Sequence, residues 1–223
     1  MHKYDLHVHT LETSPCGRVK GAEIAKLYKE NGYSGIVVTD HYTGRFFRKV
    51  RKFRWKSKVD RFLAGYREVK RVGDEIGLNV FLGMELRFKW SLNDYLVYGL
   101  DQQFIYRESQ LQKMKLSEFR EFTSDSNVLI YQAHPYRIGM TRADIEFIDG
   151  IEVFNGNPRY NSRNNLAYEF ATKNNLKMIS GSDFHQLDDL AKGGVIFRKN
   201  PDNESELVEL LKSNEYVELI GVK

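Results

Sequence analysis

The stretch Asp5-Leu6-His7-Val8-His9-Thr10 of this 223-residue chain alternates apolar residues with two histidines. Its apolar residues predict a buried β-strand over residues 4–9. Because successive side chains of a strand point to opposite faces, His7 and His9 share one face. Two imidazoles on one face of a buried strand need a partner, and a metal ion is the natural one. For this motif alone, the alternative is a pair of hydrogen-bonded core histidines.

Further motifs place a histidine or a carboxylate at the end of an apolar run. They contain His41 in Thr-Asp-His, Glu85 in Gly-Met-Glu, His134 in Ala-His-Pro, and Asp183 and His185 in Gly-Ser-Asp-Phe-His. With His7 and His9, five of the six histidines thus lie in motifs of this kind. Because the carboxyl ends of parallel strands meet at one end of a sheet or barrel, we expect these side chains to converge. Histidine and carboxylate ligands suit zinc, manganese or iron, and Glu85 is placed to bridge two ions. The alternative is a scatter of unrelated polar residues.

Short apolar runs alternate with helical patterns along the chain. We expect strands at residues 4–9, 35–40, 80–86, 95–100, 128–133, 150–154 and 177–180. We expect helices at residues 20–31, 116–123, 164–174 and 205–213, and one that begins with Ser57 as its N-cap and Asp60 as the capping-box acid. This alternation predicts a mostly parallel α/β sheet in a single domain over residues 1–223. Seven strands with polar residues at their ends favour a barrel, and a doubly wound open sheet is the alternative.

The composition places the chain among globular proteins, with 41% hydrophobic residues and a net charge of +4. The single cysteine, Cys16, excludes an internal disulfide and suits a reducing compartment. There is no apolar run of membrane-spanning length and no signal-peptide core, so we expect a cytoplasmic location and no membrane partner. The oligomeric state is not indicated.

The segment from Arg45 to Lys56 contains seven basic residues and no acidic one. Its aromatic residues are Phe46, Phe47, Phe53 and Trp55. Because the segment follows His41, we interpret residues 44–56 as an elaboration at the mouth of the fold. It is a candidate lid or clamp for a polyanionic substrate or for nucleic acid. The alternative is a solvated loop or a turn of helix whose aromatic residues pack against the barrel.

In their order along the chain, these motifs and Ile-Glu-Val-Phe-Asn at residues 151–155 closely resemble the PHP (polymerase and histidinol phosphatase) family. The resemblance extends from Asp5 to His185. It implies a distorted (β/α)7 TIM-like barrel, which agrees with the seven expected strands. It also implies a metal-dependent phosphoesterase with two or three divalent ions, which are zinc, manganese or iron.

The resemblance also implies a set of metal ligands. One ion would be held by His7, His9, Glu85 and Asp183, a second by Glu85 and His134, and a third by His41 and His185. Two positions depart from the histidine-rich members of the family. Cys16 stands where a third-site ligand is common, and Asp101 stands where many members have a second-site histidine. Each is therefore a candidate ligand whose role the sequence leaves open.

The expected reaction is hydrolysis by a metal-activated water, which needs no side-chain nucleophile. Asp40, His41 and His185 are candidate catalytic residues for moving a proton to the leaving oxygen. Arg137 is a candidate for binding the substrate phosphate, and an ordinary surface arginine is its alternative. Glu152 is expected to orient a ligand from behind.

The most favoured substrate is a small phosphomonoester, such as histidinol phosphate, a sugar phosphate or a nucleotide-like molecule. The alternatives are a phosphodiesterase or nuclease activity, or a nucleic-acid-binding module with a residual metal site. An amidohydrolase-type barrel is a further rival, because it also begins with His-x-His.

Overall fold

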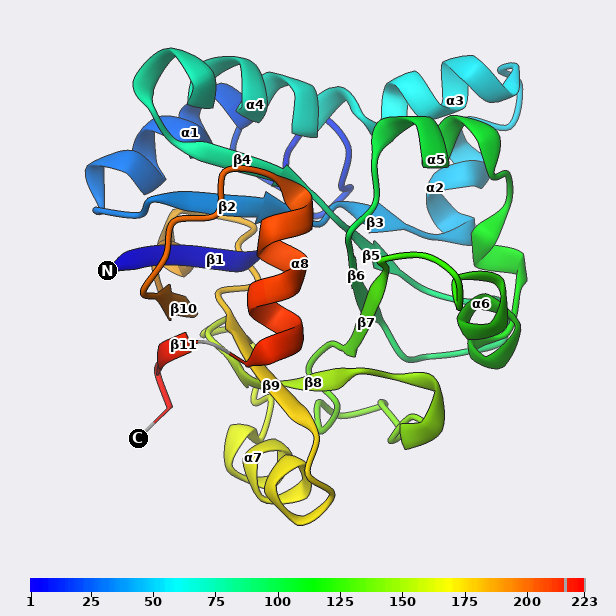
Figure 1. The fold of residues 1–223 in the computed structure, drawn as a ribbon. Coiled ribbons are helices and arrows are strands. Elements are labelled where there is room, and N and C mark those ends of the chain that lie inside the picture. Colours follow the sequence, from blue (N-terminus) through cyan, green and yellow to red (C-terminus); the bar gives the residue numbers. More distant parts are fainter. Residues whose placement is uncertain (215, 223) are drawn as a thin grey trace.

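Two β-sheets form the centre of the computed structural model, which describes residues 1–214 and 216–222. The first sheet has the strand order β11 (Tyr216–Ile220), β10 (Gly194–Phe197), β1 (His2–Val8), β2 (Gly35–Val38) and β4 (Asn79–Leu82). The second has the order β3 (His41–Tyr42), β5 (Met84–Leu86), β6 (Tyr95–Tyr98), β7 (Leu129–Gln132), β8 (Gly150–Asn155) and β9 (Lys177–Gly181). The two sheets curve around a common interior (Figure 1).

The sheets are joined at two places. The chain passes from β4 to β5 through Gly83, where a Cβ atom would lie 2.9 Å from Val37 Cγ1. At the other junction Val8 and Phe184 form an isolated parallel bridge between the ends of β1 and β9. The expected α/β class is therefore confirmed. The closed (β/α)7 barrel stays a prediction, because the paired strands form two separate sheets.

The helices cover the outside of the sheets and one end of the strands. They are α1 (Gly21–Glu30), α2 (Gly44–Lys49), α3 (Trp55–Phe62), α4 (Ala64–Ile76), α5 (Gln102–Arg107), α6 (Leu116–Phe122), α7 (Asn164–Lys173) and α8 (Glu204–Ser213). Three short 3-10 turns are η1 (Leu111–Lys113), η2 (Ile145–Phe147) and η3 (Leu187–Asp189). In Figure 1, α1 and α4 lie together over β2 and β4, while α2, α3 and α5 gather beside β3 and β6.

One predicted helix is divided in two. Ser57 lies inside α3, which begins at Trp55 with Arg54 as its N-cap, so the predicted N-cap was wrong. The helical pattern continues, but the chain ends α3 at Phe62 and starts α4 at Ala64. The basic segment also forms α2, with Thr43 Oγ1 as its N-cap acceptor, so it contains the turn of helix that was one of the alternatives.

The expected sheet was mostly parallel, and the structure corrects this for β6, β10 and β11. β6 runs antiparallel to both β5 and β7. The connection from β5 to β6 spans only residues 87–94. A parallel crossover needs about a dozen residues or more, so a connection of this length reverses the chain direction. The direction of β6 decides which of its ends faces the site.

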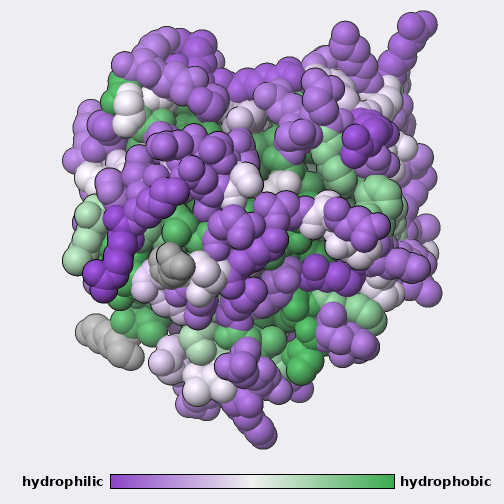
Figure 2. Space-filling view, viewed as in Figure 1, coloured by the Kyte–Doolittle hydropathy of each residue, from purple (hydrophilic) through white to green (hydrophobic). Residues whose placement is uncertain are grey.

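The end of the strands opposite the polar motifs is closed by α8. Leu207, Val208, Leu210 and Leu211 of this helix are buried. Tyr131 Oη donates a hydrogen bond to the carbonyl of Leu211 at 3.3 Å. Viewed from the α8 side, the surface is mostly hydrophilic, with hydrophobic residues showing between the polar ones (Figure 2). Within residues 1–214 and 216–222, no helix is long and apolar enough to cross a membrane.

Candidate metal centre

Seven polar side chains from five strand ends meet in one place. We call this set the metal cluster: His7, His9, His41, Glu85, His134, Asp183 and His185. The first two lie at the end of β1, and the others lie in β3, in β5, after β7 and after β9. The convergence predicted from the strand ends is therefore observed. His41 and His185 have the most exposed side chains of the set, at 20% and 11%, and the other side chains are at most 2% exposed.

Glu85 lies at the centre of the metal cluster. Its Oε1 is 3.5 Å from His7 Nε2 and 3.1 Å from His134 Nε2. Its Oε2 is 3.4 Å from His9 Nε2 and 2.6 Å from His41 Nδ1. One carboxylate thus faces four imidazoles with two oxygens. This geometry suits the bridging role expected for Glu85.

Asp183 closes the cluster from the opposite side. Its Oδ1 lies 3.4 Å from His7 Nε2, 3.5 Å from His9 Nε2 and 3.4 Å from His185 Nδ1. Its Oδ2 accepts a hydrogen bond from Arg137 Nη2 at 2.8 Å. One oxygen is therefore left facing the histidines while the other is held by a cation.

Several atoms of the cluster are buried without a hydrogen-bond partner. They are His7 Nε2, His9 Nε2 and His134 Nδ1, together with His41 Nδ1 and Glu85 Oε2, which lie 2.6 Å apart as an ion pair without forming a hydrogen bond. Buried polar atoms normally have a partner, so a group of unpartnered ones marks a place where another ligand belongs. Imidazole nitrogen and carboxylate oxygen are ligands for zinc, manganese and iron. The donor set therefore fits divalent metal ions.

Within the described residues, three groups have ligand atoms within 4.8 Å of one another. The groups are His7, His9 and Glu85; His9, His41 and His185; and Glu85, Asp94 and His134. They divide the cluster much as the three-ion arrangement implied by the resemblance does. The differences are that Asp94 joins the second group, that His9 is shared by two groups and that Asp183 belongs to none of them.

Glu152 orients two of the ligands from behind, as the sequence predicted. Its Oε1 lies 2.8 Å from His7 Nδ1, and its Oε2 accepts the backbone N–H of His134 at 2.9 Å. A proton on His7 Nδ1 leaves the lone pair of Nε2 directed at the cluster. Gly181 permits this packing, because a Cβ there would lie 2.5 Å from His7 Cβ.

His9 is oriented through a serine. Ser14 Oγ donates to Asp40 Oδ1 at 2.5 Å and lies 3.2 Å from His9 Nδ1. Because the hydroxyl proton goes to Asp40, the serine oxygen accepts from His9 Nδ1–H, and Nε2 again faces the cluster. Asp40 also accepts hydrogen bonds from the backbone and hydroxyl of Thr10. These contacts favour a positioning role for Asp40, and its predicted proton-transfer role stays untested.

The charges of the cluster oppose the cost of burial. Burial disfavours the charged form of Glu85, but His41 and His134 outweigh it and hold the pKa of Glu85 well below its ordinary value. Burial and the neighbouring His185 and His41 lower the pKa of His9 well below its ordinary value. This shift favours the neutral form of His9, which is the form that binds a metal.

Two cluster residues adopt left-handed backbone conformations. His134 has φ of 31° and Asp183 has φ of 53°. Residues other than glycine rarely adopt such φ angles, and those that do often lie at functional sites. Both residues belong to the metal cluster, so the unusual backbone conformations coincide with the candidate site.

The structure identifies Asp94, rather than Asp101, at the second group. Asp94 precedes β6, and its Oδ2 is 4.0 Å from His134 Nε2. Asp101 follows β6, is exposed, and caps α5 by accepting from Phe104 N at 2.6 Å. Because β6 is antiparallel, its first end faces the cluster. Asp94 is also ion-paired with Arg87, with 2.6 Å between Arg87 Nε and Asp94 Oδ1.

Cys16 lies at the outer edge of the cluster, with Sγ 3.2 Å from His41 Nε2. Partial burial opposes ionisation, but hydrogen bonds with His185 and His41 lower the pKa of the Cys16 thiol to about 6. A thiolate binds zinc. The three ligand groups found among the described residues do not include Cys16, so its ligation stays a hypothesis.

Arg137 lies beside the cluster but is held by protein groups. Its Nη2 contacts Asp183 Oδ2, Asn155 Oδ1 at 2.9 Å and Ser162 Oγ at 3.3 Å. Its Nε is buried without a partner. The predicted substrate contact is untested, and the cleft above the cluster includes Arg137 in its lining.

Comparisons with known proteins support the resemblance drawn from the motifs. Residues 161–216 match the sequence model of the PHP-associated family. No curated protein matches the chain in sequence.

Solved structures extend the similarity to nearly the whole chain. A two-domain protein from Bacteroides vulgatus, which contains a predicted PHP-like metal-dependent phosphoesterase, matches with a TM-score of 0.67 and 16% identity. That match covers 96% of this chain and 63% of the other, so this chain spans less than two thirds of that protein. An inferred metal-dependent phosphoesterase from Bifidobacterium adolescentis matches with a TM-score of 0.59 and 16% identity, over 98% of both chains.

An amidohydrolase from Chromobacterium violaceum has a similar fold as well. Its TM-score is 0.58 at 15% identity, and the match covers 93% of this chain and 96% of the other. Identities this low compare the fold alone. Together with the PHP-associated segment, the structural matches confirm the resemblance to PHP proteins. The reaction must be inferred from the residues of the site.

Proposed function

We propose that this chain is a metal-dependent phosphoesterase of the PHP type and that it hydrolyses a phosphomonoester. The observation that carries the proposal is the group of buried, unpartnered nitrogens and oxygens around Glu85. These atoms lie at one end of a fold shared with PHP-like phosphoesterase structures.

Two or three divalent ions would be held by the metal cluster. His7, His9, Glu85 and Asp183 suit one ion, and Glu85, Asp94 and His134 suit another. The group of His9, His41 and His185 suits a third. When bound, such ions supply water activation and charge stabilisation for phosphoryl transfer. Zinc, manganese and iron all suit the donor set.

The protein's own residues prepare the site for this chemistry. Glu152 holds the proton of His7 at Nδ1, and Ser14 holds that of His9 at Nδ1. Both imidazoles are thereby kept in the tautomer that binds a metal through Nε2. Arg137 neutralises the outer oxygen of Asp183 and lies where it can also contact a phosphate.

His41 and His185 are the residues we propose for proton transfer to the leaving oxygen. Their side chains are the most exposed of the cluster, and both line the cleft above it. Asp40 is 2% exposed and is surrounded by hydrogen-bond donors. A proton donor must reach the substrate, so exposure favours the two histidines.

The rival functions make different demands on the site. An amidohydrolase-type barrel generally relies on a lysine or on further histidines at mid-barrel strand ends. Glu85 and His134 occupy these strand ends here. A binding module with a residual metal site would be expected to lack ligands, whereas the seven predicted ligands are all present and converge.

The test is metal analysis of the purified protein, coupled to hydrolysis of an aryl phosphate with added zinc, manganese or iron. We expect at least two ions per chain and release of phosphate that a chelator stops. His9→Ala should abolish turnover, whereas His2→Ala should not change it, because His2 lies at the opposite end of β1. Hydrolysis of an aryl amide but not of an aryl phosphate would instead support the amidohydrolase reading.

A further inference from the structure

A large basic cavity opens beside the metal cluster. It has a volume of about 1300 Å³, and eight basic and no acidic residues are among the described residues that line it. We call it the cation cavity, and the residues that matter most here are Arg48, Lys58, Arg87, Lys113, Phe47 and Trp55. Its wall is built from α2, α3, the end of β5 and the loop that leads into η1. These elements lie far apart in the sequence.

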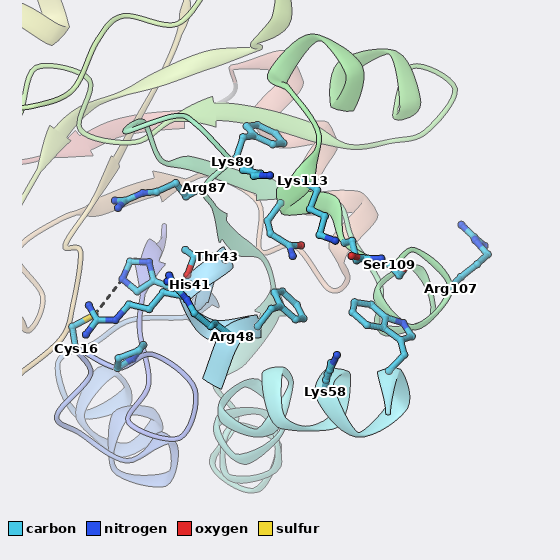
Figure 3. Close-up of a pocket in the computed structure, with 18 of the residues that line it drawn as sticks. Cys16, His41, Thr43, Arg48, Lys58, Arg87, Lys89, Arg107, Ser109 and Lys113 are labelled. Carbon is cyan, nitrogen blue, oxygen red and sulfur yellow. Dashed lines mark hydrogen bonds between the residues drawn. The ribbon is translucent and has the colours of Figure 1, made fainter. Parts of the chain in front are cut away.

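The cation cavity is continuous with the cleft over the metal cluster. Cys16, Arg18, His41 and Arg87 line both spaces. In Figure 3, Arg48 extends from α2 toward His41 and Cys16, while Lys58 and Lys113 point into the cavity from opposite walls. A ligand bound at the cluster can therefore extend into the cavity.

Much of the positive charge in the cavity is not neutralised by the protein. Arg87 is paired with Asp94, and Arg107 is paired with Glu108. Within residues 1–214 and 216–222, Arg48, Lys58 and Lys113 form no ion pair. Uncompensated cations that face one cavity attract an anionic ligand.

The cavity also has an aromatic wall. The rings of Phe47 and Trp55 stack with 5.7 Å between centroids and 19° between planes. Trp55 Nε1 donates to the carbonyl of Tyr106 at 2.7 Å, which fixes the indole. Both rings line the cavity. A fixed aromatic surface among cations suits a planar group that is attached to phosphate.

The structure divides the basic segment into two parts. Arg45 and Arg48 line the cavity, whereas Lys49, Arg51, Lys52, Arg54 and Lys56 do not. Its other aromatic residues are used elsewhere, since Phe46 is buried and Phe53 lies under Arg61 at 3.9 Å. The candidate clamp therefore contains only part of the basic segment. It also includes Lys58 and Lys113, which lie outside the segment.

We propose that the cation cavity binds the part of a nucleotide-class substrate that lies beyond the scissile phosphate. Trp55 would stack on the base, and Arg48, Lys58 and Lys113 would bind at least one additional phosphate. This inference rests on the proposed function and selects among its substrates. A cationic amine such as histidinol phosphate is disfavoured by the eight basic side chains. The volume exceeds the roughly 300–1,000 Å³ usual for small-ligand sites, which disfavours a bare sugar phosphate.

Binding can be tested without turnover. The chain has two tryptophans, so a Trp90→Phe background reports on Trp55 alone. With metal removed by a chelator, adenosine triphosphate should quench Trp55 fluorescence and bind at least about tenfold more tightly than adenosine monophosphate. The affinity for the triphosphate should fall as salt concentration rises. Equal affinities for the two nucleotides would overturn the proposal.

Charge variants locate the additional phosphate. Arg48→Met and Lys58→Met should each weaken triphosphate binding about tenfold. Lys52→Met is the matched control, because Lys52 belongs to the same basic segment but lies outside the cavity lining. An equal loss in Lys52→Met would overturn the proposal in favour of a diffuse surface charge.

A 5′-phosphorylated trinucleotide distinguishes a free nucleotide from the end of an oligonucleotide. Tighter binding of the trinucleotide would support the proposal with an oligonucleotide end as the source, and tighter binding of the triphosphate would support it with a free nucleotide. Binding of neither would overturn it. Because these measurements use metal-free protein, a failure of hydrolysis alone would contradict the proposed function and not the cavity.

Discussion

The metal cluster and the cation cavity lie side by side and are built in opposite ways. Cluster side chains come from strand ends, and five of the seven are at most 2% exposed. Hydrogen bonds to Glu152 and Ser14 set the orientation of two of its imidazoles. The cavity takes long basic side chains from helices and loops, and several of these make no ion pair within the described residues.

The difference fits what each region is proposed to bind. A metal ion needs ligands at defined positions, which rigid strands and buried hydrogen bonds supply. A flexible polyanion needs charge and a flat surface more than a fixed geometry. We therefore expect the cluster to respond to single-atom changes and the cavity to respond to charge and salt.

The largest expected effect is that of metal removal. At a metal concentration 1,000 times Kd, bound ions stabilise the folded state by about 4 kcal/mol. For a chain of this size, a chelator should lower Tm by roughly 8–16 °C. Thermal unfolding with and without chelator measures this, with Asp183→Ala as the variant whose Tm should change much less. An unchanged Tm in the wild type would contradict a metal-organised cluster.

The next effect concerns Asp5, which lies below the cluster and joins β1 to the segment after β9. It accepts hydrogen bonds from the backbone N–H groups of His7 and Ser182 and from Tyr28 Oη. Burial, opposed by these hydrogen bonds, raises the pKa of Asp5 from 3.8 to about 6. The folded state therefore binds more protons than the unfolded state between these values, and this group lowers stability as pH rises from about 4 to 6.

Above pH 6, the ionised Asp5 should cost about 3 kcal/mol relative to pH 3. Asp5→Asn removes this titration and should gain stability over the wild type as pH rises from 4 to 7. Urea unfolding of the metal-free proteins at several pH values measures the difference. If the stability of the two proteins changed in parallel with pH, burial would not raise the pKa of the Asp5 carboxyl.

Glu152→Gln tests the orientation of the cluster ligands. The amide no longer favours a proton on His7 Nδ1, and loss of such a partner typically costs 10–100-fold in metal affinity or activity. Competition with a chromophoric chelator measures the affinity. Glu146→Gln, an exposed residue of η2, is the control and should bind metal normally. Equal metal affinities in both variants would show that metal binding by the cluster does not depend on the hydrogen bond to Glu152.

The smallest expected effect tests the direction of β6. Asp94→Asn should lower the affinity for the second ion about tenfold. The effect is small because Arg87 already pairs with the Asp94 carboxylate. Asp101→Asn should change nothing, since asparagine also caps a helix well. Metal titration of both variants decides the matter. If only Asp101→Asn lowered the affinity for the second ion, Asp101 would be the ligand, as the family pattern suggested.

Much of the fold and the site could be predicted from local patterns. Polar residues at the ends of apolar runs were enough to predict that His7, His9, Glu85 and Asp183 converge, because a strand delivers its last side chains to one end. Glu152 was predicted to lie behind the ligands for the same reason. The short β3, β10 and β11 were missed, as were α5 and the break between α3 and α4.

Asp94 and Ser14 were missed for another reason. Each lies in a short polar stretch without a motif of its own, and its role depends on a partner distant in the sequence. The brevity of the connection from β5 to β6 was a signal that could have identified Asp94, because it excludes a parallel crossover.

Residue type and strand periodicity are enough to predict the donors of the metal cluster and the face on which they lie. Which end of β6 meets the cluster, and which basic residues share a cavity, became known from the folded chain. Strand direction and helix packing depend on contacts between distant segments. Arg18, Arg48, Lys58, Arg87 and Lys113 become neighbours only when α2, α3 and η1 pack around the strand ends.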